Sequence, residues 1–265
     1  MLTLNKLEKT FSKGTAHAHK ALDGLSLHIN KGDFITVVGS NGAGKSTMFN
    51  AICGDFFVDR GQIKLEDRDI TYMPAHKRSR IIGRLFQDPL KGTAANMTIE
   101  ENLALAYTSN RIGPLRFPLT KKNRDIFREP LSHFGMGLED RMKVKVGTLS
   151  GGQRQAIALL MTTIVTPDVL LLDEHTAALD PISAENVMRL TNDIVTEDNI
   201  TTLMITHNLE SALSVGNRTI MMDSGKIILD IQGEERANMT QEDIMHYYKN
   251  ANLVLSDRTL LTRYQ

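Results

Sequence analysis

The chain has 265 residues, of which 41% are hydrophobic, and this is enough for one large domain with a substantial core. Lysine plus arginine and aspartate plus glutamate both number 31, so the formal net charge is zero. Because nucleic-acid-binding proteins usually present a basic face, this balance argues against nucleic acid as the main partner.

The sequence also indicates where the protein works. Cys53 is the only cysteine, so no intrachain disulfide can form, and its place in a predicted helix suggests core packing. The first residues lack the apolar stretch of a signal peptide, and no run approaches the length of a membrane span. We therefore expect a cytosolic protein that would reach a membrane only through a partner.

The first third of the chain predicts strands at 2–7 and 25–29. The second strand alternates between apolar and polar residues, as a half-buried strand does. Phe11 falls in the loop predicted between them. An aromatic ring there can stack on a purine or cap the core, and the spacing favours neither alternative.

A glycine-rich segment follows a buried strand predicted at 34–38. It consists of Gly39, Ser40, Asn41, Gly42, Ala43, Gly44, Lys45, Ser46 and Thr47. A helix predicted at 48–53 completes the strand, turn and helix context of a G-x-x-x-x-G-K-[ST] phosphate loop. Backbone N–H groups and the helix N-terminus can cradle a polyphosphate. Lys45 can reach its β- and γ-phosphates, and the Ser46 hydroxyl can bind Mg²⁺.

The middle of the chain changes character. Strands are predicted at 62–65 and 81–86, and Pro89 ends the second so that Gln87 lies at its tip. A helix is predicted at 97–107, with a capping box at its start. Residues 110–135 carry three prolines and a basic cluster, and we expect an inserted, largely helical lobe whose charges form a solvated face rather than a binding surface.

The second half predicts strands alternating with helices, which is typical of a parallel α/β sheet. The apolar run 169–172 indicates a central strand, followed by a helix at 181–197 with Asp180 as its N-cap. The remaining predicted elements are a glycine turn at 149–153, a helix at 154–165, a strand at 201–205, a hairpin at 220–228 and a helix at 240–249.

Polar side chains follow three of the predicted strands. Asp173 and Glu174 end the apolar strand, at the edge where parallel sheets bind ligands. Asp173 can hold Mg²⁺, and Glu174 can accept a proton from the attacking water or orient it. His207 follows strand 201–205 and can donate to a γ-phosphate oxygen, while the Gln87 amide can bind Mg²⁺ and the water.

A second glycine turn at a helix N-terminus predicts a second anion site. It consists of Ser150, Gly151, Gly152 and Gln153. One nucleotide cannot easily fill two such sites in one subunit. A head-to-tail pair of subunits can share each nucleotide between the phosphate loop of one and the glycine turn of the other.

Together these motifs resemble the ATP-binding cassette (ABC) family over residues 2–235. The phosphate loop resembles the Walker A motif, Gln87 the Q-loop, LSGGQ the signature, VLLLDE the Walker B strand, residues 178–180 the D-loop and His207 the switch histidine. Phe11 lies where the family stacks adenine on an aromatic ring. One residue departs from the pattern, because His175 stands where the family usually has proline.

The resemblance implies a P-loop NTPase fold with a RecA-like core, an antiparallel β subdomain and an inserted helical subdomain. We expect the core at 1–90 and 166–235, the helical subdomain at 91–165 and a short extension at 236–265. It also implies Mg²⁺ and two ATP at a head-to-tail dimer interface. The nucleotide would contact the phosphate loop and Phe11 of one subunit, and the glycine turn and Asp180 of the other.

The expected function is that of the ATPase subunit of a bacterial importer, working with separate membrane permeases and a substrate-binding protein at the cytoplasmic face of the membrane. An amino acid is the expected kind of solute. Two alternatives remain at this point, an exporter ATPase and a soluble cassette ATPase that acts on nucleic acid or ribosomes. The neutral charge and the absence of a long heptad run weigh against the second alternative.

Overall fold

The computed structural model describes residues 1–109 and 121–247, and the chain in it divides into two compact units. Met1–Tyr72 and the chain from Met204 onward form the first unit, and Met73–Leu203 forms the second. Strand β8 (Thr201–Ile205), all of whose residues are buried, leads from the second unit to the first. Each unit is described by itself.

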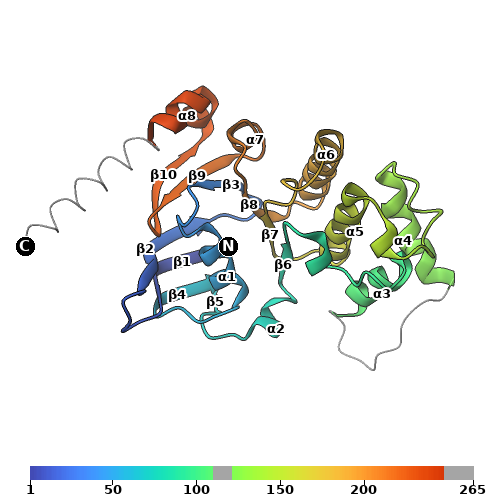
Figure 1. Ribbon diagram of the computed structural model, residues 1–265, viewed down its shortest axis with the longest axis horizontal. Coiled ribbons are helices and arrows are strands. Elements are labelled where there is room, and N and C mark those ends of the chain that lie inside the picture. The colour runs from blue at the N-terminus through green and yellow to red at the C-terminus, as the bar shows by residue number, and fades with distance from the viewer. Residues whose placement is uncertain (110–120, 248–265) are drawn as a thin grey trace, which may run out of the picture. The chain divides into compact units, whose positions relative to one another are not determined.

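An antiparallel sheet in the first unit has the order β2-β1-β4-β5 (Figure 1). Its strands are β1 (Leu2–Phe11), β2 (His19–Ile29), β4 (Arg60–Leu65) and β5 (Arg68–Asp69). The alternation predicted at 25–29 is confirmed, since Leu25, Leu27 and Ile29 are buried. Strand β1 is longer than predicted, because Phe11 pairs with His19 and so ends a strand instead of lying in a loop.

The first unit also carries β3 (Phe34–Gly39), β9 (Arg218–Asp223) and β10 (Lys226–Gln232). Strand β9 runs parallel to β3 and antiparallel to β10, which confirms the predicted closing hairpin. The helices of this unit are α1 (Lys45–Cys53), α7 (Leu209–Ser214), α8 (Gly233–Asn238) and residues 241–247. Val38, Met221 and Ile244 share a hydrophobic cluster that joins strands and helices.

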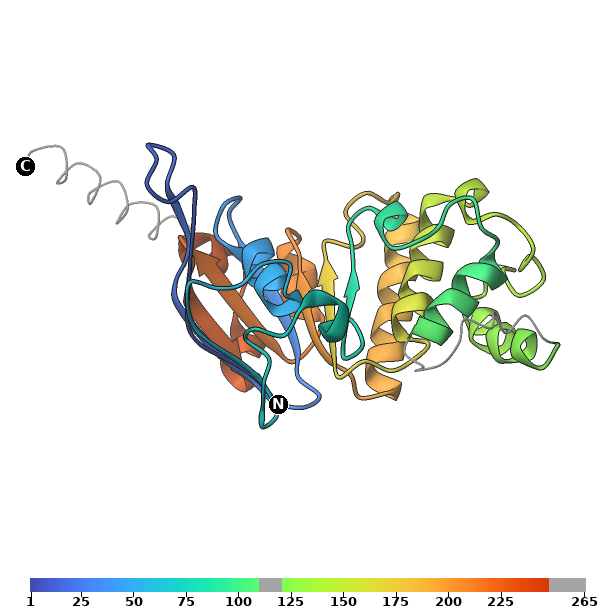
Figure 2. The ribbon, with the colours of Figure 1, turned by 90° about the horizontal axis from the view of Figure 1, so that it is seen from below.

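The second unit combines a parallel strand pair with most of the helices. Strand β6 (Ile82–Leu85) pairs in parallel with β7 (Val169–Asp173). The helices are α2 (Ala75–Arg78), α3 (Ile99–Ser109), α4 (Lys121–His133), α5 (Gly151–Thr163) and α6 (Pro181–Glu197), with 3-10 turns at Pro89–Lys91 and Val146–Thr148. Helix α5 packs between α3 and α6, as Figure 2 shows.

Local capping explains where the helices of this unit begin. The capping box before α3 is confirmed, because Thr98 N donates to Glu101 Oε2 at 2.7 Å and Glu101 N donates to Thr98 Oγ1 at 3.3 Å. Helix α6 has the predicted bounds, and Ser183 N donates to Asp180 Oδ1 at 3.0 Å. Helix α5 begins earlier than predicted, because Ser150 is its N-cap.

The predicted helical lobe at 91–165 lies within the second unit, although its boundaries remain a prediction. In the basic cluster, Arg124 pairs with Glu100 and Arg128 with Asp140. Arg111, Arg116 and the side chains of Lys121 and Lys122 lie outside the described residues, as does the rest of the helix expected at 240–249. In the described part of the chain, no helix is long and apolar enough to cross a membrane.

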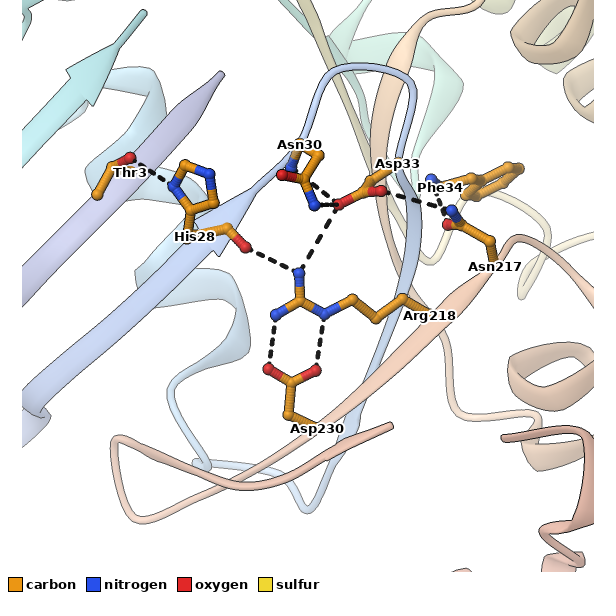
Figure 3. A network of polar contacts seen from close by, with 8 residues as sticks. All are labelled: Thr3, His28, Asn30, Asp33, Phe34, Asn217, Arg218 and Asp230. Carbon is orange, nitrogen blue, oxygen red and sulfur yellow. Dashed lines mark hydrogen bonds and ion pairs between the residues drawn. The ribbon is translucent and has the colours of Figure 1, made fainter. Parts of the chain in front are cut away.

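A polar network around Arg218 ties the β9–β10 hairpin to β2 and the turn before β3 (Figure 3). The guanidinium donates to both carboxylate oxygens of Asp230, at 2.7 and 2.6 Å, and to the His28 carbonyl oxygen at 2.8 Å. Asp33 Oδ2 lies 3.7 Å from the same guanidinium and accepts from Asn30 N at 2.8 Å. The Asp230 hydrogen bonds raise the pKa of Arg218, whose side chain is only 11% exposed.

Replacing Arg218 by methionine is expected to lower the free energy of unfolding by about 1–3 kcal/mol, since it leaves a carboxylate and a carbonyl without their charged donor. The matched control is Lys226→Met on the same hairpin, which removes an ion pair to Asp23 from a lysine that is 54% exposed. That pair should contribute at most about 1 kcal/mol. Urea titration followed by circular dichroism measures both, and equal losses would contradict the buried role of Arg218.

Candidate functional site

The phosphate loop, residues 39–47, is shaped by backbone conformations that favour glycine. It leaves β3, whose six residues are all buried, and ends in α1. Gly39 and Gly44 have φ angles of 153° and 101°. A Cβ atom on Gly39 would collide with the Met222 carbonyl oxygen, and one on Gly44 would lie 2.6 Å from the Ala21 carbonyl oxygen. Other side chains are therefore excluded at these two positions.

Lys45 is buried within the loop, with 6% of its surface exposed. Its Nζ donates to the carbonyl oxygens of Gly39 at 2.6 Å and Ser40 at 3.0 Å. The Gly225 N–H braces the loop from the hairpin turn by donating to the Ala43 carbonyl oxygen at 2.9 Å. The structure thus holds an ammonium group inside a turn of backbone amides, an arrangement suited to a polyphosphate.

The outer part of the loop is open to solvent. Asn41, Gly42 and Ser46 are exposed, whereas Ser40 and Thr47 are half-buried. The Ser46 hydroxyl therefore lies at the surface at the start of α1, where a metal ion bound to phosphates can meet it.

His207 lies on the first unit with the phosphate loop. Thr206 N donates to the Val37 carbonyl oxygen at 3.2 Å, which places the end of β8 beside β3 just before the loop begins. His207 is exposed, and Asn208 after it caps α7 by accepting from Ser211 N at 3.0 Å. The structure therefore brings the histidine and the loop to neighbouring strand ends, as predicted.

Phe11 lies at the end of β1 with 39% of its surface exposed. Its ring meets the Phe56 ring edge-to-face, with centroids 5.4 Å apart, and Lys9 Nζ lies 5.5 Å from its centroid. The ring therefore lies at the surface, outside the buried core, and is accessible to a ligand. Phe56 and Lys9 were not predicted from the sequence, although Lys9 and Phe11 share one face of a strand by their spacing.

Asp173 is the last residue of β7 in the second unit, and Glu174 follows it directly. Arg84 Nη2 donates to Asp173 Oδ2 at 2.9 Å, and both side chains are largely buried. The Arg84 guanidinium also lies 4.8 Å from the centroid of the Phe86 ring. Arg84 was not predicted from the sequence, yet a charged residue inside the apolar strand predicted at 81–86 is a signal that could have found it.

Gln87 is exposed, two residues after the end of β6, and a buried side chain holds the backbone of Phe86 before it. Gln155 Nε2 on α5 donates to the Phe86 carbonyl oxygen at 3.1 Å. Gln155 is fully buried, and its hydrogen bond ties helix α5 to the backbone just before Gln87. On the other side of Gln87, Asp88 caps the 3-10 turn by accepting from Leu90 N at 3.0 Å.

The glycine turn forms the first turn of α5 instead of preceding the helix. Gln153 N donates to Ser150 Oγ at 3.2 Å and Ser150 N donates to Gln153 Oε1 at 3.3 Å, which makes a capping box. A Cβ on Gly152 would lie 2.7 Å from Ser183 Oγ, so this glycine also allows α5 to approach α6 closely. Ser150 and Gly151 remain exposed at the helix N-terminus.

His175, directly after the acid pair, is a fully enclosed polar side chain, with 2% exposed. Burial lowers its pKa to about 4, so the ring is neutral at physiological pH. Glu174 has a φ of 50°, in the left-handed region. Further along the loop, hydrogen bonds from Ser183 lower the pKa of Asp180.

The structure thus gathers the predicted site residues in two groups, one in each unit. The first unit holds the phosphate loop, Phe11 and His207. The second holds Gln87, the glycine turn, the acid pair and Asp180. The loop amides and ammonium group of the first unit can bind anions, and the carboxylates of the second can hold a cation or take a proton.

Comparison with known proteins identifies the family. The ABC transporter family model matches residues 22–177. The chain is 42% identical to the tyrosine transport ATP-binding protein of Clostridioides difficile, over 95% of this chain and all of that one. It is 33% identical to the methionine import ATP-binding protein MetN of Rhizobium etli, over 80% of this chain and 56% of that one.

Solved structures agree. A dimeric cassette, MJ0796, in a post-hydrolysis state with ADP and Pi is 27% identical, with a TM-score of 0.75 over 88% of this chain and 98% of that one. The ADP form of the cassette MJ1267 is 29% identical, with a TM-score of 0.76 over 94% of this chain and 98% of that one. The chain therefore belongs to the ABC transporter family, as an ATP-binding subunit with the P-loop NTPase fold of an ABC cassette.

Proposed function

We propose that the chain hydrolyses ATP to power the import of a small solute, such as an amino acid, through separate permease subunits. The observation that carries this proposal is the ordered phosphate loop, with the buried Lys45 ammonium group held against two of its carbonyl oxygens. Relatives named for tyrosine transport and methionine import support a transport role and an amino-acid solute.

The loop suits a nucleotide because hydrogen bonds to its own carbonyl oxygens hold the Lys45 ammonium group in place. In the proposal, β- and γ-phosphate oxygens replace these partners, while loop N–H groups bind the phosphates. The exposed Phe11 ring stacks on the adenine, with Phe56 supporting it from the edge.

The donor set also suits Mg²⁺. This ion takes oxygen ligands and usually combines one or two protein groups with phosphates and water. The Ser46 hydroxyl, the Gln87 amide oxygen and the Asp173 carboxylate would hold it. Bound there, it would neutralise charge on the phosphates.

Hydrolysis is assigned to groups that can move or hold a proton. Glu174 accepts a proton from the attacking water, and Gln87 orients that water. His207 donates a hydrogen bond to a γ-phosphate oxygen, and Lys45 stabilises the charge that develops on the transferred group.

Two copies of the chain are proposed to bind two ATP head to tail. Each nucleotide would then lie between the phosphate loop of one copy and the glycine turn of the other, with Asp180 at the shared interface. The N-terminus of the 13-residue helix α5, where Ser150 and Gly151 are exposed, favours an anion. The similar cassette MJ0796, solved as a dimer with ADP and Pi, supports the pairing of two copies.

In this proposal, ATP closes the pair, because its γ-phosphate bridges the two copies, and hydrolysis removes the bridge. The opening and closing of the pair drive conformational changes in permeases embedded in the membrane, with the cassettes at its cytoplasmic face. A substrate-binding protein would deliver the solute from the other side.

Purification of the tagged chain from detergent-solubilised membranes of its source is expected to recover integral membrane subunits. Reconstituted into vesicles, the complex should move labelled tyrosine or methionine towards the side that carries the cassettes, and only with Mg-ATP on that side. The Glu174→Gln complex is the control, because it should assemble but not transport.

Movement of either amino acid away from the cassette side would contradict import and indicate an exporter. Recovery of ribosomes or nucleic acid, with ATPase activity that a nuclease abolishes, would contradict the transport role altogether. A complex that hydrolyses ATP and moves neither amino acid would exclude tyrosine and methionine as the transported solute.

A further inference from the structure

A short loop, residues 174–180, connects β7 to α6. It carries the acid Glu174 at its start and the helix cap Asp180 at its end. Two turns shape the backbone between them, since Ala177 N donates to the Glu174 carbonyl oxygen at 3.0 Å and Leu179 N donates to that of Thr176 at 3.2 Å. Within this loop, His175 is the fully enclosed polar side chain.

His175 reaches from the loop to the middle of α6. Its Nε2 lies 3.1 Å from Thr191 Oγ1. The Thr191 hydroxyl donates to the Val187 carbonyl oxygen at 2.8 Å, one helical turn back, so its proton is already used. The hydroxyl therefore accepts from His175, and the ring carries its proton on Nε2. Thr191 is itself fully buried, so this hydrogen bond forms out of contact with water.

The neighbouring Glu174 has a backbone conformation that needs such support. Its φ of 50° lies in the left-handed region, which residues other than glycine seldom adopt. Such conformations persist only where the surrounding structure holds them. The hydrogen bond of the next side chain to a helix is a local restraint of this kind.

We propose that His175 is a positioning residue, whose hydrogen bond to Thr191 fixes the backbone beside Glu174 and so aims its carboxylate at the attacking water. The inference rests on the proposed role of Glu174 as the proton acceptor. It assigns a function to the His175–Thr191 pair that packing alone does not require, because an apolar side chain of similar volume would fill the same space.

The test compares variants that keep the volume with variants that also keep the hydrogen bond. His175→Leu and Thr191→Val remove the hydrogen bond, whereas His175→Gln keeps a donor at a similar reach and Thr191→Ser keeps the acceptor. We expect the first two to lower kcat for ATP hydrolysis about tenfold, because a small misplacement of a reacting group is costly. KM should stay within about twofold, and the second two variants should retain most of kcat.

The double variant His175→Leu/Thr191→Val should lose no more than either single variant, since one hydrogen bond is lost in all three. If His175→Leu does not fold, Thr191→Val, which hardly changes shape, provides the same comparison with Thr191→Ser. Thermal melts followed by circular dichroism check folding in each case.

Several results would overturn the inference. His175→Leu and Thr191→Val with the parent kcat would show that the hydrogen bond does not matter. Equal losses in the leucine and glutamine variants would assign His175 to packing, and additive losses in the double variant would uncouple it from Thr191. A parent rate in Glu174→Gln would instead overturn the proposed role of Glu174 as the proton acceptor. The positioning role alone fails if that variant is inactive while His175→Leu is not.

Discussion

Glu174→Gln is expected to slow ATP hydrolysis by about 10²–10⁴-fold and to leave ATP binding within about twofold of the parent. Glutamine has the shape of glutamate but cannot accept a proton, so the water would lose its base while the phosphate loop keeps its contacts. The backbone there should tolerate the change, because the side chain alone differs at the left-handed position. Phosphate release measures the rate, and a fluorescent ATP analogue measures binding.

The matched control is Glu185→Gln, which makes the same chemical change at an exposed carboxylate on α6. It should keep the parent rate, because Glu185 is exposed on α6 and has no role in the proposed hydrolysis. If Glu174→Gln hydrolyses ATP at the parent rate, Glu174 is not the proton acceptor. If it loses ATP binding instead, its role is in holding the nucleotide.

The sequence predicted best where neighbouring residues determine structure. Helix α6 begins where expected, because Asp180 and Pro181 set its first turn whatever lies around them. The fully buried strands β3 and β8 are apolar runs that stand out in any reading of the chain. The phosphate loop was found because its motif is itself a local strand, turn and helix.

Prediction failed where the outcome depends on contacts between distant segments. Helix α5 starts at Gly151 although glycine favours a turn, because the capping box and close packing against Ser183 hold the glycines helical. Strand β1 extends to Phe11 because β2 lies beside it. The Arg84–Asp173 ion pair joins residues 89 positions apart, and no spacing rule connects them.

His175 shows what the sequence can and cannot predict about a single residue. The sequence marked it as a departure from the family pattern but gave no partner. Its partner Thr191 lies 16 residues further on, in the third turn of a helix whose register had to be known first. A buried hydrogen bond of this kind is visible only once the loop and the helix are placed together.

Ser150→Arg, made in the Glu174→Gln background, is expected to abolish the ATP-induced dimer. With Mg-ATP and without hydrolysis, the background should form a species of twice the monomer mass of 29.5 kDa. Arginine at position 150 removes the hydroxyl that caps α5 and adds a bulky side chain at the exposed helix N-terminus proposed to meet the partner's nucleotide. The dimer should weaken at least about 100-fold, which corresponds to about 2.7 kcal/mol.

Ser132→Arg is the control, because it makes the same change at an exposed serine on a different helix, α4. Size-exclusion chromatography with light scattering gives the mass, and nucleotide titration shows whether the monomer still binds ATP. If the variant still binds ATP but no longer dimerises, the glycine turn lies at the shared nucleotide, because the variant's own phosphate loop is unchanged. A dimer that persists in Ser150→Arg would overturn the head-to-tail arrangement. A background that stays monomeric with Mg-ATP would mean that shared nucleotide alone does not join two copies, so that permeases must hold them together.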